Sequence, residues 1–156
     1  MIVVVMGVSG SGKTTIGKLL AERLAVPFLD ADEFHPPVNV DKMAAGTPLN
    51  DEDRKPWLAT LNEMLRQQQN AVLACSALKE SYRYMLSKGI SDCRFVHLRG
   101  SIELIGERLK ERQHRYMPAS LLESQFATLE QPVNALAVDI ALPPELCVEQ
   151  IAASLH

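Results

Sequence analysis

The chain has 156 residues, a length typical of one domain with its own hydrophobic core. Hydrophobic residues make up 47% and charged residues 22%, as in ordinary soluble globular proteins. A formal net charge of −3 argues against a protein that follows the backbone of nucleic acid. No apolar run approaches the roughly 18 residues of a membrane helix, and the apolar N-terminus lacks the basic region of a signal peptide. The three cysteines lie far apart and fit reduced thiols of a cytoplasmic protein.

The most informative stretch is the glycine-rich sequence GVSGSGKT at residues 7–14, which fits the pattern Gly-x-x-x-x-Gly-Lys-Ser/Thr. An apolar, mostly β-branched run at 1–6 predicts a buried parallel strand before it, and 15–25 has the apolar spacing of a helix. In that setting, backbone N–H groups at a helix N-terminus surround a phosphate. Lys13 is expected to reach the β- and γ-phosphates, and Thr14 to ligate Mg²⁺. The predicted nucleotide-binding residues of this phosphate loop are Gly7, Val8, Ser9, Gly10, Ser11, Gly12, Lys13, Thr14 and Thr15.

Two acids, Asp30 and Asp32, stand at the end of a second predicted strand, residues 27–32. Their spacing places both on one side of a strand. The carboxyl ends of parallel strands meet at the edge where ligands of open α/β folds bind. Two carboxylates on one side are costly unless a cation or a substrate hydroxyl lies between them. We therefore expect this pair beside the phosphate loop rather than as solvated loop acids.

Residues 33–53 form a long insertion rich in Pro, Asn, Gly and Asp, with a short helix predicted at 40–45. Long loops in compact domains are usually functional. Asn50 or Asp53 can cap the next helix, which tolerates Pro56 only in its first turn. The apolar spacing beyond this proline predicts a helix with one buried face.

The third predicted strand, residues 71–76, ends in Cys75 and Ser76. In many phosphate-loop ATPases this strand ends in the aspartate that directs Mg²⁺. The acid must therefore come from elsewhere in this chain, and Asp30 or Asp32 is the nearest candidate.

The last part of the chain continues the alternation of strands and helices. A fourth strand is predicted at 94–98, where His97 alternates with apolar neighbours and is interpreted as a packed histidine. A helix at 120–129, a strand at 135–142 and a helix from Pro143 complete the pattern.

Two groups of basic residues have alternative interpretations. Lys79 and Arg83 are four residues apart on one predicted helix, which fits a solvated basic face and an anion site equally well. Residues 108–115 are a basic cluster in an otherwise acidic protein, with Arg108 and Arg112 one helical turn apart. Solvation is the usual explanation of a charge run. Phosphoryl transfer, however, needs donors at the developing charge of the γ-phosphate, so we predict a lid over about 108–118.

Several blocks of the sequence together resemble the gluconokinase family. They are the phosphate loop, DADEFHP at 30–36, DRKPWL at 53–58, CSALK at 75–79 and LLESQ at 121–125. The resemblance covers nearly the whole chain. It implies ATP-dependent phosphorylation of D-gluconate on its 6-hydroxyl, and homodimers. It also implies an α/β three-layer sandwich like that of shikimate and nucleoside monophosphate kinases, with a five-stranded parallel sheet of order 2-3-1-4-5 and a mobile lid.

The resemblance and the residue chemistry together suggest roles for the site residues. ATP·Mg²⁺ lies across the phosphate loop, with Arg108 near the adenine and Arg112 and Arg115 on the phosphates. Asp32 orients the attacking hydroxyl or accepts its proton, while Asp30 supports Mg²⁺ through water. The predicted catalytic residues are Lys13, Asp32 and Arg112.

The gluconate-binding residues are predicted from position and charge. Arg54 matches by position the carboxylate-binding arginine of shikimate kinases, and is the candidate for the gluconate carboxylate. Further substrate-contact candidates are His35, Lys79, Arg83 and Gln125.

Two other functions are weighed against this one. A related small-molecule kinase would phosphorylate shikimate or a nucleotide, although the long insertion at 33–53 is not expected there. A non-catalytic nucleotide-binding switch would bind nucleotide without turnover, and would leave the paired acids and the arginine cluster unexplained.

Overall fold

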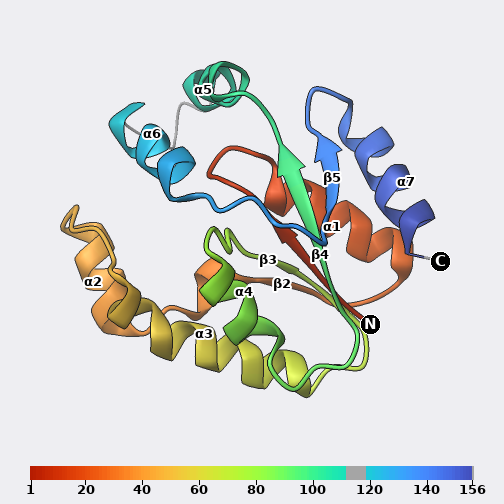
Figure 1. The fold of residues 1–156 in the computed structure, drawn as a ribbon, viewed down its shortest axis with the longest axis horizontal. Helices are drawn as coiled ribbons and strands as arrows, with labels where there is room; N and C mark the ends of the chain where they lie inside the picture. The colour runs from red at the N-terminus through yellow and green to blue at the C-terminus, as the bar shows by residue number, and fades with distance from the viewer. Residues whose placement is uncertain (112–118, 156) are drawn as a thin grey trace.

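In a computed structural model, which describes residues 1–111 and 119–155, the chain forms a five-stranded parallel sheet with helices on both faces (Figure 1). The strand order is β2-β3-β1-β4-β5. This order and the three-layer α/β architecture confirm the predicted fold class. The strands are β1 (Ile2–Met6), β2 (Phe28–Asp30), β3 (Ala71–Ala74), β4 (Cys93–Arg99) and β5 (Leu136–Asp139). The helices are α1 (Lys13–Leu24), the 3₁₀ turn η1 (Ala31–Phe34), α2 (Pro37–Ala44), α3 (Asp51–Arg66), α4 (Glu80–Ser87), α5 (Ile102–Glu111), α6 (Ala119–Thr128) and α7 (Pro144–Ser154).

The central strand β1 is buried on both sides, which explains its unbroken apolar sequence. Val3 and Val5 face one core, which is covered by α1 and α7 and extended by apolar residues of α5 and α6. Ile2, Val4 and Met6 face the other core, which is covered by α3 and α4. Because β1 pairs with β3 on one side and β4 on the other, its carboxyl end lies at the middle of the sheet edge.

The second strand is shorter than predicted, and this changes the position of one acid. β2 ends at Asp30, and the chain then turns into η1, so Asp32 lies in a 3₁₀ turn and not on the strand. The side chain of Asp30 accepts a hydrogen bond from the backbone N–H of Asp32 at 3.0 Å and so caps the turn. The prediction that the two acids share one side of a strand is therefore wrong.

The helices also differ from the predicted ones in two places. Asn50 and Asp53, each predicted as a possible cap, together form a capping box at the start of α3. Pro56, however, is the sixth residue of that helix and does not lie in its first turn. Its missing N–H affects only a carbonyl close to the helix start, where the chain is exposed. The α4 helix begins at Glu80 because Ala77 has a φ angle of 45°, which no α-helix accepts, and Lys79 is an N-cap with extended backbone.

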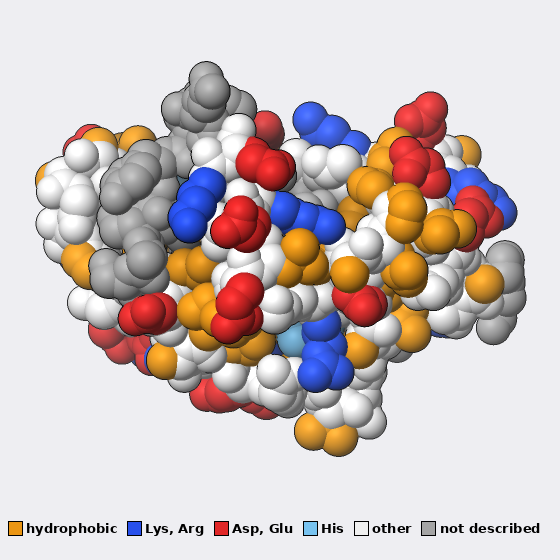
Figure 2. Space-filling model, turned by 90° about the horizontal axis from the view of Figure 1, so that it is seen from above, with side chains coloured by type: hydrophobic (Ala, Val, Ile, Leu, Met, Phe, Trp, Pro, Cys, Tyr) orange, Lys and Arg blue, Asp and Glu red, His pale blue; other side chains and the backbone are white. Residues whose placement is uncertain are grey.

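On the face of the molecule shown in Figure 2, the described residues carry both positive and negative charges. Lys and Arg side chains are interspersed with Asp and Glu side chains and with apolar groups (Figure 2). Such a surface differs from the continuous basic stripe of proteins that follow a nucleic-acid backbone.

The packing of α3 against α4 depends on one buried amide. Asn62 is 8% exposed, and its Nδ2 donates to the carbonyls of Leu86 and Lys88, both at 2.8 Å. Asn62→Leu, of similar volume, should lower the free energy of unfolding by about 2–4 kcal/mol, because both carbonyls lose their donor. Urea denaturation measures this change. The exposed neighbour Glu63 provides a control, since Glu63→Gln should change stability by less than about 0.5 kcal/mol. Equal stability of both variants would show that the amide is dispensable.

Candidate active site

The phosphate loop connects β1 to α1 at the carboxyl edge of the sheet. Gly10 and Gly12 have φ angles of 83° and 94°, in the left-handed region that glycine tolerates best. Gly12 is the N-cap of α1, and no side chain forms a cap hydrogen bond there. The first N–H groups of α1 are therefore not used by a capping side chain, and such groups at a helix N-terminus bind phosphate. The local geometry fits the nucleotide site predicted for this loop.

Several predicted catalytic groups converge on one buried thiol at the end of β3. Burial raises the pKa of Cys75 to about 12; Lys13 counteracts this rise, and Asp32 and Asp30 add to it. The thiol is thus not ionised and is no nucleophile. Lys13 itself donates from Nζ to the carbonyl of Val8 at 3.0 Å. Lys13, Asp30 and Asp32 therefore lie around the same edge of the sheet, as the sequence predicts.

The expected Mg²⁺ ligands are also brought together. The Thr14 hydroxyl donates to Oδ2 of Asp30 over 3.5 Å, while the other oxygen of Asp30 holds η1. Within residues 1–111 and 119–155, no group of three His, Cys, Asp or Glu side chains is placed to hold a metal ion. Mg²⁺ prefers oxygen ligands and keeps several waters, with substrate phosphates completing its shell. One hydroxyl and one carboxylate beside a phosphate site fit that chemistry.

The insertion brings His35 next to the acid and the arginine predicted to contact substrate. Its ring stacks on Trp57 with centroids 4.1 Å apart, and the Trp57 indole N–H donates to the carbonyl of Ala31 at 2.7 Å. The pKa of His35 is lowered mainly by burial; the charge of Asp32 raises it, and that of Arg54 lowers it. Asp32, His35 and Arg54 therefore interact electrostatically in one region.

Arg54 and Lys79 meet around a tyrosine that the sequence did not single out. The guanidinium of Arg54 and the ammonium of Lys79 each lie 5.6 Å from the centroid of the Tyr82 ring. Lys79 bonds both carboxylate oxygens of Asp51, at 3.1 and 3.2 Å, and the Tyr82 hydroxyl donates to the same carboxylate. These hydrogen bonds lower the pKa of Asp51, and the bond from Tyr82 has the largest effect. We call Asp51, Arg54, Lys79 and Tyr82 the Tyr82 cluster.

Sequence reasoning missed two members of this cluster for identifiable reasons. Asp51 is the first residue of α3 and resembles an ordinary acid of a first turn, which interacts favourably with the helix dipole. Tyr82 is 6% exposed and belongs to the apolar pattern of the second core. The spacing of three residues between Lys79 and Tyr82 was the available signal, since it places both on one helical face.

Arg83 is buried, which fits neither of its two interpretations from the sequence. Its side chain is 3% exposed, and its guanidinium donates to the carbonyls of Ala77 and Glu130 and to the carboxylate of Glu80. Neither a solvated basic face nor a substrate contact describes this position. Arg83 connects the β3–α4 loop to the segment after α6.

Two further predicted residues have contacts on the nucleotide side. Gln125, on α6, bonds Ser9 of the phosphate loop. Arg108, on α5, donates to the carbonyl of Ile140 in the turn after β5. The lid predicted at about 108–118 is described only up to residue 111, and Arg112 and Arg115 lie outside the described residues.

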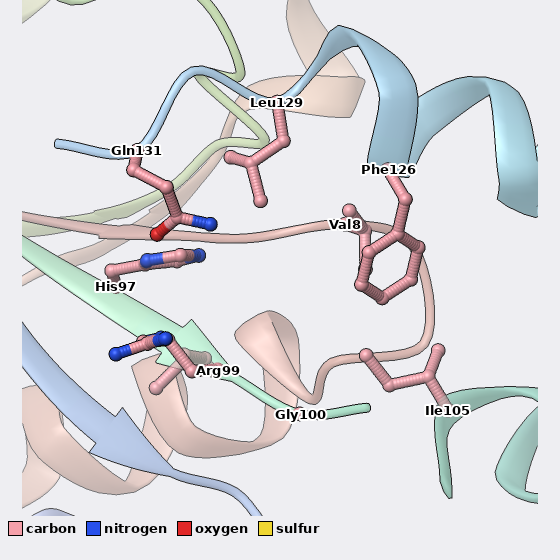
Figure 3. A pocket seen from close by; sticks show the side chains of 9 residues that line it. Val8, His97, Arg99, Gly100, Ile105, Phe126, Leu129 and Gln131 are labelled. Carbon is pink, nitrogen blue, oxygen red and sulfur yellow. The ribbon is translucent and has the colours of Figure 1, made fainter. Parts of the chain in front are cut away.

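A small cavity of ≈ 90 Å³ adjoins the phosphate loop at Val8 (Figure 3). His97, Arg99 and Gln131 lie at one end of it, and Phe126 faces Val8 at the other. Burial lowers the pKa of His97 to about 4, and the positive charges of Arg99 and Arg83 act in the same direction. This volume is far below the roughly 300 Å³ of small-molecule sites, so the cavity is a packing feature, and His97 is packed as predicted.

The family model for shikimate kinase matches residues 9–135. A probable gluconokinase of Xenopus tropicalis is 45% identical over 97% of this chain and 91% of that protein. A gluconokinase of Gluconobacter oxydans (strain 621H) is 52% identical over 83% of this chain and 75% of that protein. The chain belongs to the gluconokinase family. A crystal structure of a gluconokinase from Sinorhizobium meliloti 1021 has 43% identity and a TM-score of 0.87, covering 98% of this chain and 94% of that one.

Membership of the gluconokinase family agrees with the family resemblance predicted from the sequence. The likeness to the gluconokinase structure covers 98% of this chain and therefore includes both the sheet and the insertion. None of the helices in the described parts of the chain is long and apolar enough to cross a membrane.

The buried His97 predicts a specific loss of stability in acid. The unfolded chain takes up a proton here near pH 6.5, whereas the folded chain does so only near pH 4. The unfolded state thus binds more protons in this range, so the free energy of unfolding falls as pH decreases from 6.5 to about 4. The slope from this residue is at most about 1.4 kcal/mol per pH unit. His97→Gln should flatten that slope in urea titrations between about pH 7 and pH 4.5; an unchanged slope would refute it.

Proposed function

We propose that this chain transfers the γ-phosphoryl group of ATP·Mg²⁺ to the 6-hydroxyl of D-gluconate, giving 6-phospho-D-gluconate and ADP. The observation that carries the proposal is that Asp32 acts electrostatically on Cys75, as Lys13 does, and on His35, as Arg54 does. These interactions relate three things: the phosphate loop, the acid Asp32 and the cations of the Tyr82 cluster. The relatives named gluconokinase support the choice of acceptor. A nucleotide-binding switch would need only the first of the three.

On the nucleotide side, the phosphates would lie on the N–H groups of residues 10–15, with Lys13 moving from the Val8 carbonyl to the β- and γ-phosphates. Thr14 and Asp30, the latter through water, would hold Mg²⁺, which neutralises charge on the phosphates. Arg108 lies beside the turn after β5 and would pack against the adenine there.

On the acceptor side, the reaction needs one hydroxyl in line with the γ-phosphorus. Its oxygen forms the new P–O bond while the bond to the ADP oxygen breaks, and its proton passes to Asp32. The backbone of Asp32 is fixed by a hydrogen bond, which its N–H donates to the carboxylate of Asp30. The carboxylate need not be a strong base, because the transition state is loose and positioning provides most of the catalysis.

The carboxylate of gluconate would bind at the other end of the acceptor, near Arg54 and Lys79. Arg54 offers a planar fork that matches a carboxylate, and its present partners are neutral oxygens of Leu49 and Tyr82, at 2.6 and 3.4 Å. Lys79 is already paired with Asp51, which is 55% exposed in its side chain and could rotate into water. His35 interacts electrostatically with both Asp32 and Arg54, and would bond a hydroxyl along the carbon chain of gluconate.

A panel of acceptors tests the proposed function. Coupled ADP release should be fast with D-gluconate, and at least about 100-fold slower with sorbitol, which has the hydroxyls but no carboxylate for Arg54 to bind. Shikimate and nucleoside monophosphates should also be poor acceptors. Lys13→Ala serves as the background, because loss of a charge on the transferred phosphoryl group costs about 2–4 kcal/mol. Faster turnover of shikimate than of gluconate would overturn the choice of acceptor.

Asp32→Asn tests the catalytic role, since it keeps the size of the side chain and removes its charge. The value of kcat should fall by about two to four orders of magnitude. The affinity for an ATP analogue with Mg²⁺ should change little, because the loop and Thr14 hold the nucleotide. Single-turnover kinetics and analogue titration on one preparation measure both. A parallel loss of affinity and rate would instead identify Asp32 as a metal ligand, leaving Asp30 as the candidate base; unchanged values of both would make the pair structural.

A further inference from the structure

The contact between Gln125 and Ser9 joins α6 to the phosphate loop across 116 positions of sequence. The backbone N–H of Ser9 donates to Oε1 of Gln125 at 2.7 Å, and Nε2 of Gln125 donates to Oγ of Ser9 at 3.0 Å. A backbone N–H can only donate, so it fixes which end of the amide faces it. Both polar ends of the side chain are therefore used by one residue of the loop.

We propose that Gln125 is a positioning residue that holds the phosphate loop in its nucleotide-binding form, and that it does not contact the sugar acid. This differs from the role predicted from the sequence, which grouped Gln125 with the substrate contacts. The oxygen and the nitrogen of the Gln125 amide each already bond the loop, and turning the amide toward a gluconate hydroxyl would break the bond that the Ser9 N–H donates.

The helices that precede and follow residues 112–118 both support the same part of the loop. A methyl group added at Gly10 would lie 2.8 Å from Cγ of Leu109 and 3.1 Å from Cγ2 of Ile105, so α5 packs directly on the loop backbone. Val8 is 3% exposed and belongs to the same core as Leu122 of α6. Residues 8–10 thus rest on α5 and α6, whereas residues 13–15 belong to α1.

The loop needs support from outside because its own side chains supply little. The hydroxyl of Ser11 is buried and has no hydrogen-bond partner among the described residues. Lys13 bonds the Val8 carbonyl, but it would give up this bond when its ammonium moves to the phosphates. The bond from Gln125 goes to Ser9 and does not compete with phosphate for Lys13. It can therefore persist in the nucleotide complex and keep the left-handed turn at Gly10 in place.

Gln125→Met tests this inference, because methionine keeps the length of the side chain and forms neither hydrogen bond. We expect the Kd for an ATP analogue with Mg²⁺ to rise about tenfold, the effect of one or two lost hydrogen bonds. The KM for gluconate should stay within about twofold of wild type. Ser124→Ala is the matched control, since the neighbouring Ser124 is exposed and should change neither value.

Ser9→Ala provides an independent variant if Gln125→Met folds poorly, and by itself it should weaken binding of the ATP analogue, though less than Gln125→Met does. It removes only the hydroxyl acceptor and leaves the backbone N–H. Combined with Gln125→Met it should weaken analogue binding by less than the product of the two single effects, because both changes remove one shared contact. Multiplicative effects on analogue affinity would contradict the pairing.

The outcomes separate this inference from the proposed function on which its gluconate measurement rests. Analogue titration needs no phosphoryl transfer and reports on the loop even if gluconate is not the acceptor. A rise in the KM for gluconate with unchanged analogue affinity would overturn the inference and restore Gln125 as a substrate ligand. A lower melting temperature with both binding constants unchanged would also overturn it, since Gln125 would then be only structural.

Discussion

The structure depends on one backbone constraint: the chain must turn sharply between the central strand and α1 while its N–H groups face inward. Gly10 and Gly12 meet it with left-handed φ angles of 83° and 94°. Because β1 is the middle strand, this turn lies at the centre of the sheet edge, next to the ends of β3 and β4. Asp30 at the end of β2, Asp32 just after it, and the Cys75 thiol just after β3 are therefore placed around the phosphate loop by the strand order alone.

The acceptor side is organised by different forces, mainly stacking and ion pairing between the insertion and residues outside it, such as Trp57 and Lys79. Trp57 of α3 holds η1 through the Ala31 carbonyl and supports the ring of His35. At the start of α3, the Tyr82 cluster gathers two cations and one carboxylate at the surface of α4. In this account the loop fixes one end of the reaction, and these contacts fix the other.

The sequence predicted the strand order through the family resemblance, and the phosphate loop from its motif and setting. The prediction from sequence failed for residues whose positions are determined by contacts that form only in the folded chain. Arg83 has the spacing of a surface residue, yet its guanidinium is buried among carbonyls that only the folded chain brings together. Gln125 is 116 positions from Ser9, so no local pattern relates them. Asp32 leaves the strand because Asp30 caps a 3₁₀ turn, a competition between local hydrogen bonds that periodicity does not detect.

The central claim is that the acceptor is held by its carboxylate near Arg54 and presents its far, primary hydroxyl to Asp32. Phosphorus NMR of the product made from ATP and D-gluconate tests this most directly, with proton coupling retained. A phosphomonoester on the primary carbon gives a triplet, because two protons on that carbon couple to the phosphorus, and this is the expected result. A doublet, which one proton on a secondary carbon produces, would show that gluconate binds in another orientation. Release of inorganic phosphate without an ester would contradict the kinase itself.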